Sequence, residues 1–243
     1  DYSVSEMISA KGICYQNERT EDYAKAHPSD HPLALQLFGS EVSFMVKAAR
    51  YLEEHYPYEV LDINMGCPVR KVVKNGDGSA LMRDEKKAME IVEALVEHTS
   101  KPVTVKIRTG ISDESKNCVS FAKAMEKAGA SMVVVHGRTA QQMYSGKANW
   151  EDIGRVKDAL DIPVIGNGDI TCLEEGLQRM KDYHVDGVMV GRALRGNPFI
   201  ARDFKQYFLD QSMPQEVTIE DRFRVMMAHL GYLIEERGER LAI

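Results

Sequence analysis

Cysteine is scarce and scattered in this sequence, which has only Cys14, Cys67, Cys118 and Cys172 and no pair spaced as CxxC. This spacing indicates neither a disulfide framework nor a zinc site, and reduced thiols in a cytoplasmic protein are the simplest account. The chain also lacks an apolar run of the about 18 residues that a membrane span needs, and no signal peptide opens it. We therefore expect a cytoplasmic protein with no membrane anchor and no metal site.

Basic residues are the minority among the charged ones, which leaves a net charge of −6. That balance predicts solubility and argues mildly against a polyanionic partner, unless basic residues gather on one face. There is also no composition break before residues 211–214, and apolar residues between Phe223 and Ile234 then recur at helical spacing. We expect a main domain over residues 1–210 and the beginning of a helical domain over residues 211–243.

Short apolar segments alternate with amphipathic ones along most of the chain. Strands that are apolar nearly throughout indicate a parallel sheet covered by helices, and about 250 residues is the usual size of a (β/α)8 TIM barrel. A closed barrel needs eight strands, so the missing first strand is expected to precede Asp1. Seven strands are predicted, near residues 4–8, 32–39, 60–63, 102–108, 131–136, 162–169 and 187–192.

The most informative strand ends in the turn Asn64-Met65-Gly66-Cys67-Pro68. Proline cannot continue a ladder of hydrogen bonds and glycine permits unusual backbone angles, so the chain turns with Cys67 at the carboxyl end of the strand. In a parallel barrel this end is the active-site face. The alternative is that Cys67 is a small buried hydrophobe, the usual fate of a free cysteine.

Other polar residues also gather at predicted strand ends, and most of them have both a structural and a functional interpretation. Gln36 and His136 could belong to buried structural networks or contact a ligand. Lys106 could form a structural ion pair or stabilise negative charge that develops beside an electron-accepting ring. The glycine-rich turn at residues 166–169 and the Gly191-Arg192 pair favour phosphate binding through backbone amides and a cation.

Taken together, these segments resemble the tRNA-dihydrouridine synthases, most closely the bacterial B-type branch. The matching segments, in the order of that family, are Gln36-Leu37-Phe38-Gly39, Asp62-Ile63-Asn64-Met65-Gly66-Cys67-Pro68, Val105-Lys106-Ile107-Arg108, His136-Gly137-Arg138-Thr139, Gly166-Asn167-Gly168-Asp169, and Gly191-Arg192-Ala193 with Gly196-Asn197-Pro198.

The resemblance implies FMN bound across the barrel mouth, NADPH or NADH as reductant, and tRNA as substrate. Cys67 would protonate C5 of a flipped-out uridine, since a thiol with an ordinary pKa of about 8.5 is mostly protonated at neutral pH. Cofactor contacts are implied for Gln36, Lys106, His136, Asn167, Gly168, Asp169, Gly191 and Arg192. Substrate contacts are expected from Asn64 and from a cationic rim formed by Arg70, Lys71, Lys74 and Arg138.

Three departures from the family pattern concern the ends of the chain and one loop. The family's first strand, which carries an Ala-Pro-Met segment against FMN, is missing, the helical tRNA-binding domain is represented by its first helix only, and Ala140 replaces a frequent basic residue. Dihydroorotate and dihydropyrimidine dehydrogenases, FMN barrels that act on a free pyrimidine, are the nearest alternative. There an asparagine typically follows the proline, where Val69 stands here. A non-catalytic RNA-binding module is the third alternative.

Overall fold

The computed structural model of the chain describes residues 2–27 and 30–242. It divides into two compact units, Asp1–Ala193 and Leu194–Ile243, which are described separately. The domain boundary expected from the sequence lies at residue 210, and helix α9 (Phe199–Asp210), which precedes it, belongs to the second compact unit.

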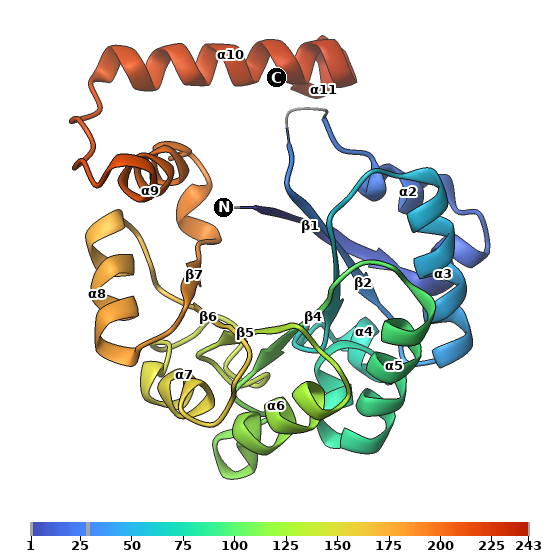
Figure 1. Ribbon diagram of the computed structural model, residues 1–243. Helices are drawn as coiled ribbons and strands as arrows, with labels where there is room; N and C mark the ends of the chain where they lie inside the picture. The colour runs from blue at the N-terminus through green and yellow to red at the C-terminus, as the bar shows by residue number, and fades with distance from the viewer. Residues whose placement is uncertain (1, 28–29, 243) are drawn as a thin grey trace. The chain divides into compact units, whose positions relative to one another are not determined.

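The first unit is built on one parallel sheet that curls, with helices along its outer side (Figure 1). Its strands pair in chain order, each with the next, and β1 and β7 form its two edges among the described residues. The predicted parallel α/β barrel architecture with seven strands in this chain is confirmed. The strands are β1 Ser3–Ser9, β2 Leu33–Phe38, β3 Val60–Asn64, β4 Val103–Arg108, β5 Met132–His136, β6 Val164–Asn167 and β7 Gly187–Met189.

The covering helices form because their apolar residues recur on one face. In α5, Ala88, Ile91, Val92 and Leu95 are all buried, while the residues between them include several charged ones. This stripe packs toward the sheet, whose own residues are buried because helices cover them. The longer helices of this unit are α3 Val42–His55, α5 Glu85–His98, α6 Cys118–Lys127, α7 Trp150–Lys157 and α8 Leu173–Tyr183.

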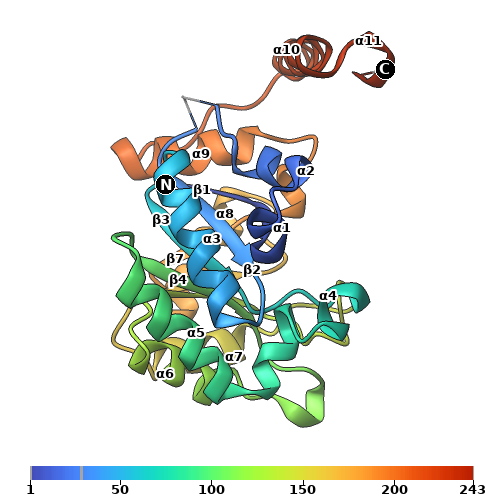
Figure 2. The same cartoon turned by 90° about the vertical axis from the view of Figure 1, so that its right-hand side faces the viewer.

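Short helices occupy several of the connections between strands and longer helices. Figure 2 shows α1 and α4, which follow β1 and β3, on the same side of the sheet, as parallel strands require of segments at their carboxyl ends. These elements are α1 Ala10–Cys14, α2 Glu18–Glu21, η1 Asp22–Ala24, α4 Arg70–Lys74, η2 Gly78–Arg83, η3 Asp113–Ser115 and η4 Arg192–Leu194.

The second unit is helical. The helix predicted between residues 223 and 234 lies within α10 (Ile219–Arg237), and α11 spans Glu239–Ala242. Thr218 begins α10 with a capping box, in which its hydroxyl accepts from the Asp221 amide and the Asp221 carboxylate accepts from the Thr218 amide. The start of this helix is therefore determined locally by two side chains.

Candidate functional site

The register of the sheet brings the predicted strand-end residues together. Asn64 of β3 pairs with Lys106 of β4, and His136 of β5 pairs with Arg108 on one side and Asn167 on the other. Neighbouring strands lie about 4.8 Å apart, so side chains at paired positions are in reach of one another. The structure thus gathers at one edge of the sheet residues that the sequence analysis had selected separately.

Cys67 lies in a turn that is held from several directions. Its backbone N–H donates to Asn64 Oδ1 at 2.8 Å, and the N–H of Gly66 donates to the same oxygen at 3.1 Å. The Gly66 carbonyl accepts from Arg108 Nε at 2.8 Å, and the Cys67 carbonyl accepts from the Ser79 amide at 3.0 Å. Cys67 is partly exposed rather than buried, so the alternative of a core cysteine does not hold.

Lys106 lies near the carboxyl end of β4 and places a cation in a partly buried position. Its Nζ donates to Asn167 Oδ1 at 3.3 Å, and Asn167 Nδ2 in turn donates to the Met189 carbonyl at 2.8 Å. Burial lowers the pKa of Lys106 to about 8, against the opposing effect of the Asp62 carboxylate. The ammonium therefore remains mostly charged at neutral pH, although it is held with less stabilisation than in water.

His136 is buried and surrounded by cations. Burial, followed by the charges of Lys106, Arg108 and Arg138, lowers its pKa to about 3, so its imidazole is neutral at physiological pH. Arg138 Nη1 lies 3.4 Å from His136 Nε2. Because a guanidinium can only donate, Nε2 is the acceptor and the ring proton is assigned to Nδ1.

The sequence predicts Arg138 on an exposed rim. In the structure Arg138 is buried instead, with an exposed fraction of 2%. Its Nη2 donates to both oxygens of Asp169 at 2.8 and 2.9 Å and to the Gly146 carbonyl at 2.6 Å, and its Nε donates to the Ser145 carbonyl at 3.1 Å. Asp169 also accepts from Arg192 Nη2 at 3.2 Å. Arg138 therefore ties the loop after β5 to the loop after β6.

The glycine-rich turn after β6 is fixed by the only tryptophan of the chain. Trp150 Nε1 donates to the Gly168 carbonyl at 3.1 Å, and its ring lies directly against Gly166. Gly168 has a φ of +137°, a conformation that other residues rarely adopt. Gly166 is needed so that Trp150 of α7 can pack closely against β6, and Gly168 is needed so that the backbone can take the direction of the turn.

Replacing Gly166 with alanine is expected to lower the free energy of unfolding by about 1–3 kcal/mol, because overpacking a filled core is destabilising. The new Cβ would lie 2.6 Å from Cη2 of Trp150. Urea unfolding followed by circular dichroism measures the effect. Gly191→Ala is the matched control, since its Cβ would meet no atom within 4 Å; equal stability of the two variants would contradict the packing argument.

The other predicted rim cations lie on α4, immediately after the Cys67 turn. Arg70, Lys71 and Lys74 are all exposed. A hollow of about 360 Å³ adjoins one of them, Lys71, and is also lined by the ends of β1 and β2, the first residues of α1 and α3, and by Val72, Asn75 and Asp77. Three exposed cations therefore follow the Cys67 turn on one short helix.

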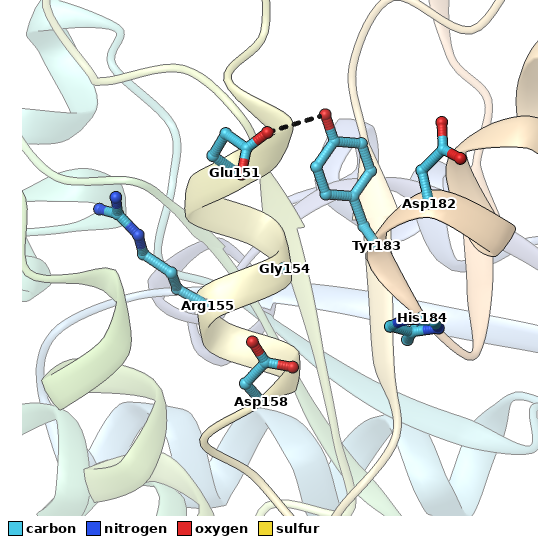
Figure 3. A pocket seen from close by; sticks show the side chains of 7 residues that line it. All are labelled: Glu151, Gly154, Arg155, Asp158, Asp182, Tyr183 and His184. Atoms are coloured by element: carbon cyan, nitrogen blue, oxygen red, sulfur yellow. Dashed lines mark hydrogen bonds between the residues drawn. The ribbon is translucent and has the colours of Figure 1, made fainter.

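Figure 3 shows another hollow, of about 370 Å³, in the helical layer between α7 and α8. Its lining includes positively and negatively charged side chains, and Tyr183 Oη donates to Glu151 at 3.3 Å across the hollow. It includes no strand-end residue and is not part of the candidate site. The lining residues are Glu151, Gly154, Arg155, Asp158, Asp182, Tyr183 and His184.

Three residues of the site were missed by the sequence analysis or given no role there. Asp62 is 3% exposed inside β3 and accepts hydrogen bonds from neighbouring strands, and Arg108 holds the Cys67 turn. The sequence does carry a signal for Asp62 and Arg108, because a charged residue within or at the end of an apolar strand indicates a buried polar contact. Trp150 gave no such signal, because a tryptophan on a helical face is an ordinary core residue.

Two features are not found among residues 2–27 and 30–242. No helix there is long and apolar enough to cross a membrane, and no three or more His, Cys, Asp or Glu side chains are grouped so that they could hold a metal ion.

Comparison with known proteins places the chain in a family. A family model described as dihydrouridine synthase matches residues 1–243. A Rickettsia bellii protein named "Probable tRNA-dihydrouridine synthase" is 38% identical over 241 residues, which cover 99% of this chain and 74% of the relative. The "tRNA-dihydrouridine synthase B" of Pseudomonas putida is 36% identical over 241 residues, which cover 99% of this chain and 71% of the relative.

A solved structure of a Burkholderia cenocepacia protein, a candidate lyase or mutase, superposes with a TM-score of 0.54 at 14% identity and covers 91% of this chain and 84% of its own. At that identity the likeness shows the fold alone. The match of the family model over the whole length, together with relatives above one third identity, establishes that the chain belongs to the dihydrouridine synthase family.

Proposed function

We propose that this chain reduces the C5–C6 double bond of uridine in tRNA, as a flavin-dependent tRNA-dihydrouridine synthase that uses NADPH or NADH. The observation that carries the proposal is a partly exposed thiol, Cys67, held in a rigid turn beside a cluster of cations at the strand ends. Family membership and the names of the relatives support the same activity.

The strand ends suit an anionic flavin such as FMN. Three cations, Lys106, Arg108 and Arg138, are close enough to His136 to depress its pKa, although the net charge of the chain is −6. Positive charge concentrated in one place attracts and orients an anion. The backbone at Gly191 is open to a ligand, because a Cβ at this position would meet no atom within 4 Å.

The residues proposed to hold the flavin come from five strand ends. Lys106 and Gln36 would contact its ring with His136 nearby, and the ribityl phosphate would be held by Asn167, Gly168, Asp169, Gly191 and Arg192. Arg192 is half-exposed, and its partner Asp169 is also paired with Arg138, so the Arg192 guanidinium can still attract a phosphate. A flavin bound here would supply the hydride that adds to C6 of uracil.

The protein's own part in the reaction centres on the proton. Cys67 holds a proton on Sγ and transfers it to C5, so that one hydride and one proton together saturate the double bond. Lys106 stabilises negative charge that develops in the site. Asn64 donates one of its two Nδ2 hydrogens to Gln36 and can offer the other to the uracil.

The tRNA is proposed to contact α4, whose exposed Arg70, Lys71 and Lys74 follow Cys67 directly. Phosphate contacts of this kind position an RNA without reading its sequence. Chemistry on a base also requires that the base leave its stack and enter a pocket. Cations next to the thiol would hold the backbone on either side of the extruded uridine.

The test is to reduce the purified, flavin-loaded protein anaerobically with NADPH and then add uridine-containing tRNA. The visible absorbance of oxidised flavin should return, and nuclease digestion followed by mass spectrometry should show uridine that has gained two hydrogens. Reoxidation by a free pyrimidine but not by tRNA would support a dihydroorotate or dihydropyrimidine dehydrogenase instead. A colourless protein that binds tRNA would support a non-catalytic module.

A further inference from the structure

Asp62 lies at the centre of a polar network within the sheet. Its Oδ2 accepts from Gln36 Nε2 and its Oδ1 accepts from Thr104 Oγ1, both at 2.6 Å. Gln36 and Thr104 are its register partners on β2 and β4, so the three side chains lie at one level across three strands. A buried carboxylate needs such donors, and here each oxygen has one.

This carboxylate sets the direction of the hydrogen bonds that follow. An ionised carboxylate can only accept, so Gln36 must turn its Nε2 toward Asp62. The Oε1 of Gln36 then accepts from Asn64 Nδ2 at 2.8 Å, which leaves Asn64 Oδ1 to accept from the backbone N–H groups of Gly66 and Cys67. If the side-chain amide of Gln36 or Asn64 were flipped, its nitrogen would face another N–H donor, and the series of hydrogen bonds would be broken.

The charge state needed for this arrangement is present at neutral pH. Burial raises the pKa of Asp62 to about 6, while the hydrogen bonds from Thr104 and Gln36 and the charge of Lys106 act in the opposite direction. Asp62 is therefore mostly ionised at pH 7 and accepts on both oxygens.

We propose that Asp62 is a positioning residue for Cys67, acting through the amides of Gln36 and Asn64 to hold the backbone that carries the thiol. Asp62 does not bond to Cys67 directly; three hydrogen bonds in series, through the side-chain amides of Gln36 and Asn64, connect the two. The catalytic consequence rests on the proposed function. The positioning itself does not, since it concerns only residues of this chain.

The test measures the reactivity of each cysteine. The full chain and its Asp62→Asn variant are alkylated with iodoacetamide at pH 7.5, and the rate at every cysteine is followed by mass spectrometry. Asparagine carries no charge, so even where its Oδ1 accepts from Gln36 that bond is no longer charge-assisted; the turn should loosen, and Cys67 should react about fivefold faster, as expected for a bond weakened by about 1 kcal/mol. Cys14 and Cys172, both partly exposed, are internal references whose rates should not change.

Asp152→Asn is the matched control, because Asp152 is also buried, pairs with Lys116, and has no link to Gln36 or Asn64. Its effect on the Cys67 rate should be absent. Gln36→Met breaks the same series one step later and should raise the Cys67 rate as Asp62→Asn does, which keeps the test decisive if the latter variant does not fold. Combining Gln36→Met with Asp62→Asn should add nothing further.

An unchanged Cys67 rate in both variants would overturn the proposal, as would equal increases at Cys14 and Cys172, which indicate general loosening. In the tRNA assay, Asp62→Asn should lower kcat and leave KM for tRNA unchanged. If the alkylation result holds but no tRNA is reduced by the parent chain, the positioning role stands and the proposed function fails.

Discussion

Replacing Cys67 with alanine is expected to slow the tRNA-dependent reoxidation of reduced flavin by about 10²–10⁴-fold, the usual contribution of a positioned general acid. The physical reason is that Cys67 carries the acidic thiol of the site. Hydrogen bonds with Asn64, Arg108 and Ser79 fix the backbone of the turn that holds it. Without it, C5 of the uracil must take its proton from water. Stopped-flow absorbance after mixing reduced enzyme with tRNA measures the rate.

The same variant should leave the earlier half of the reaction intact. Reduction of the bound flavin by NADPH needs no proton donor at Cys67, so its rate should match that of the parent chain. Cys172→Ala is the matched control, because Cys172 is also partly exposed but lies just before α8 and outside the strand-end cluster. Equal reoxidation rates for the Cys67 variant and the parent would remove the assigned role of the thiol.

The fold could be predicted because its determinants are local. A parallel strand covered on both faces must be apolar along its length, so β2 and β5 are visible as short continuous runs. The rule that carboxyl ends of parallel strands share one edge then gathers Cys67, Lys106 and Asn167 without any knowledge of their contacts. The functional division of the chain at residue 210 stays a prediction, as do the individual roles of the site residues.

Burial of polar residues could not be predicted in the same way. Arg138 stands in a His-Gly-Arg-Thr turn, which locally has the composition of an exposed loop, yet its partners are carbonyls seven and eight residues later and a carboxylate from the next strand-loop unit. Asp62 is satisfied by residues of two other strands. Such partners are distant in sequence, and only the tertiary structure brings them together.

Arg138→Met is expected to lower the free energy of unfolding by about 3 kcal/mol, the lower end of the range for breaking a buried ion pair, because the Asp169 side chain is 32% exposed and water can partly replace its partner. The carbonyls of Ser145 and Gly146 also lose their donor. Urea unfolding at neutral pH measures the loss. Arg192→Met is the matched control, since Arg192 pairs with the same carboxylate but is 55% exposed, and should cost about 1 kcal/mol or less.

The dependence of this loss on pH separates the charge of Arg138 from its packing. Burial alone would raise the pKa of Asp169, but hydrogen bonds from the Ala148 amide and Arg138, together with the charges of Arg138 and Arg192, outweigh it and lower the pKa. A carboxyl whose pKa is lowered by folding contributes stability that is complete above its unfolded value of about 3.9 and is lost as the pH falls through the folded value. The difference in stability between the parent and Arg138→Met should therefore be constant above about pH 5 and shrink below about pH 4. A difference that does not change with pH would mean that the buried guanidinium stabilises this loop by packing and by its bonds to carbonyls, and that its pairing with Asp169 contributes little.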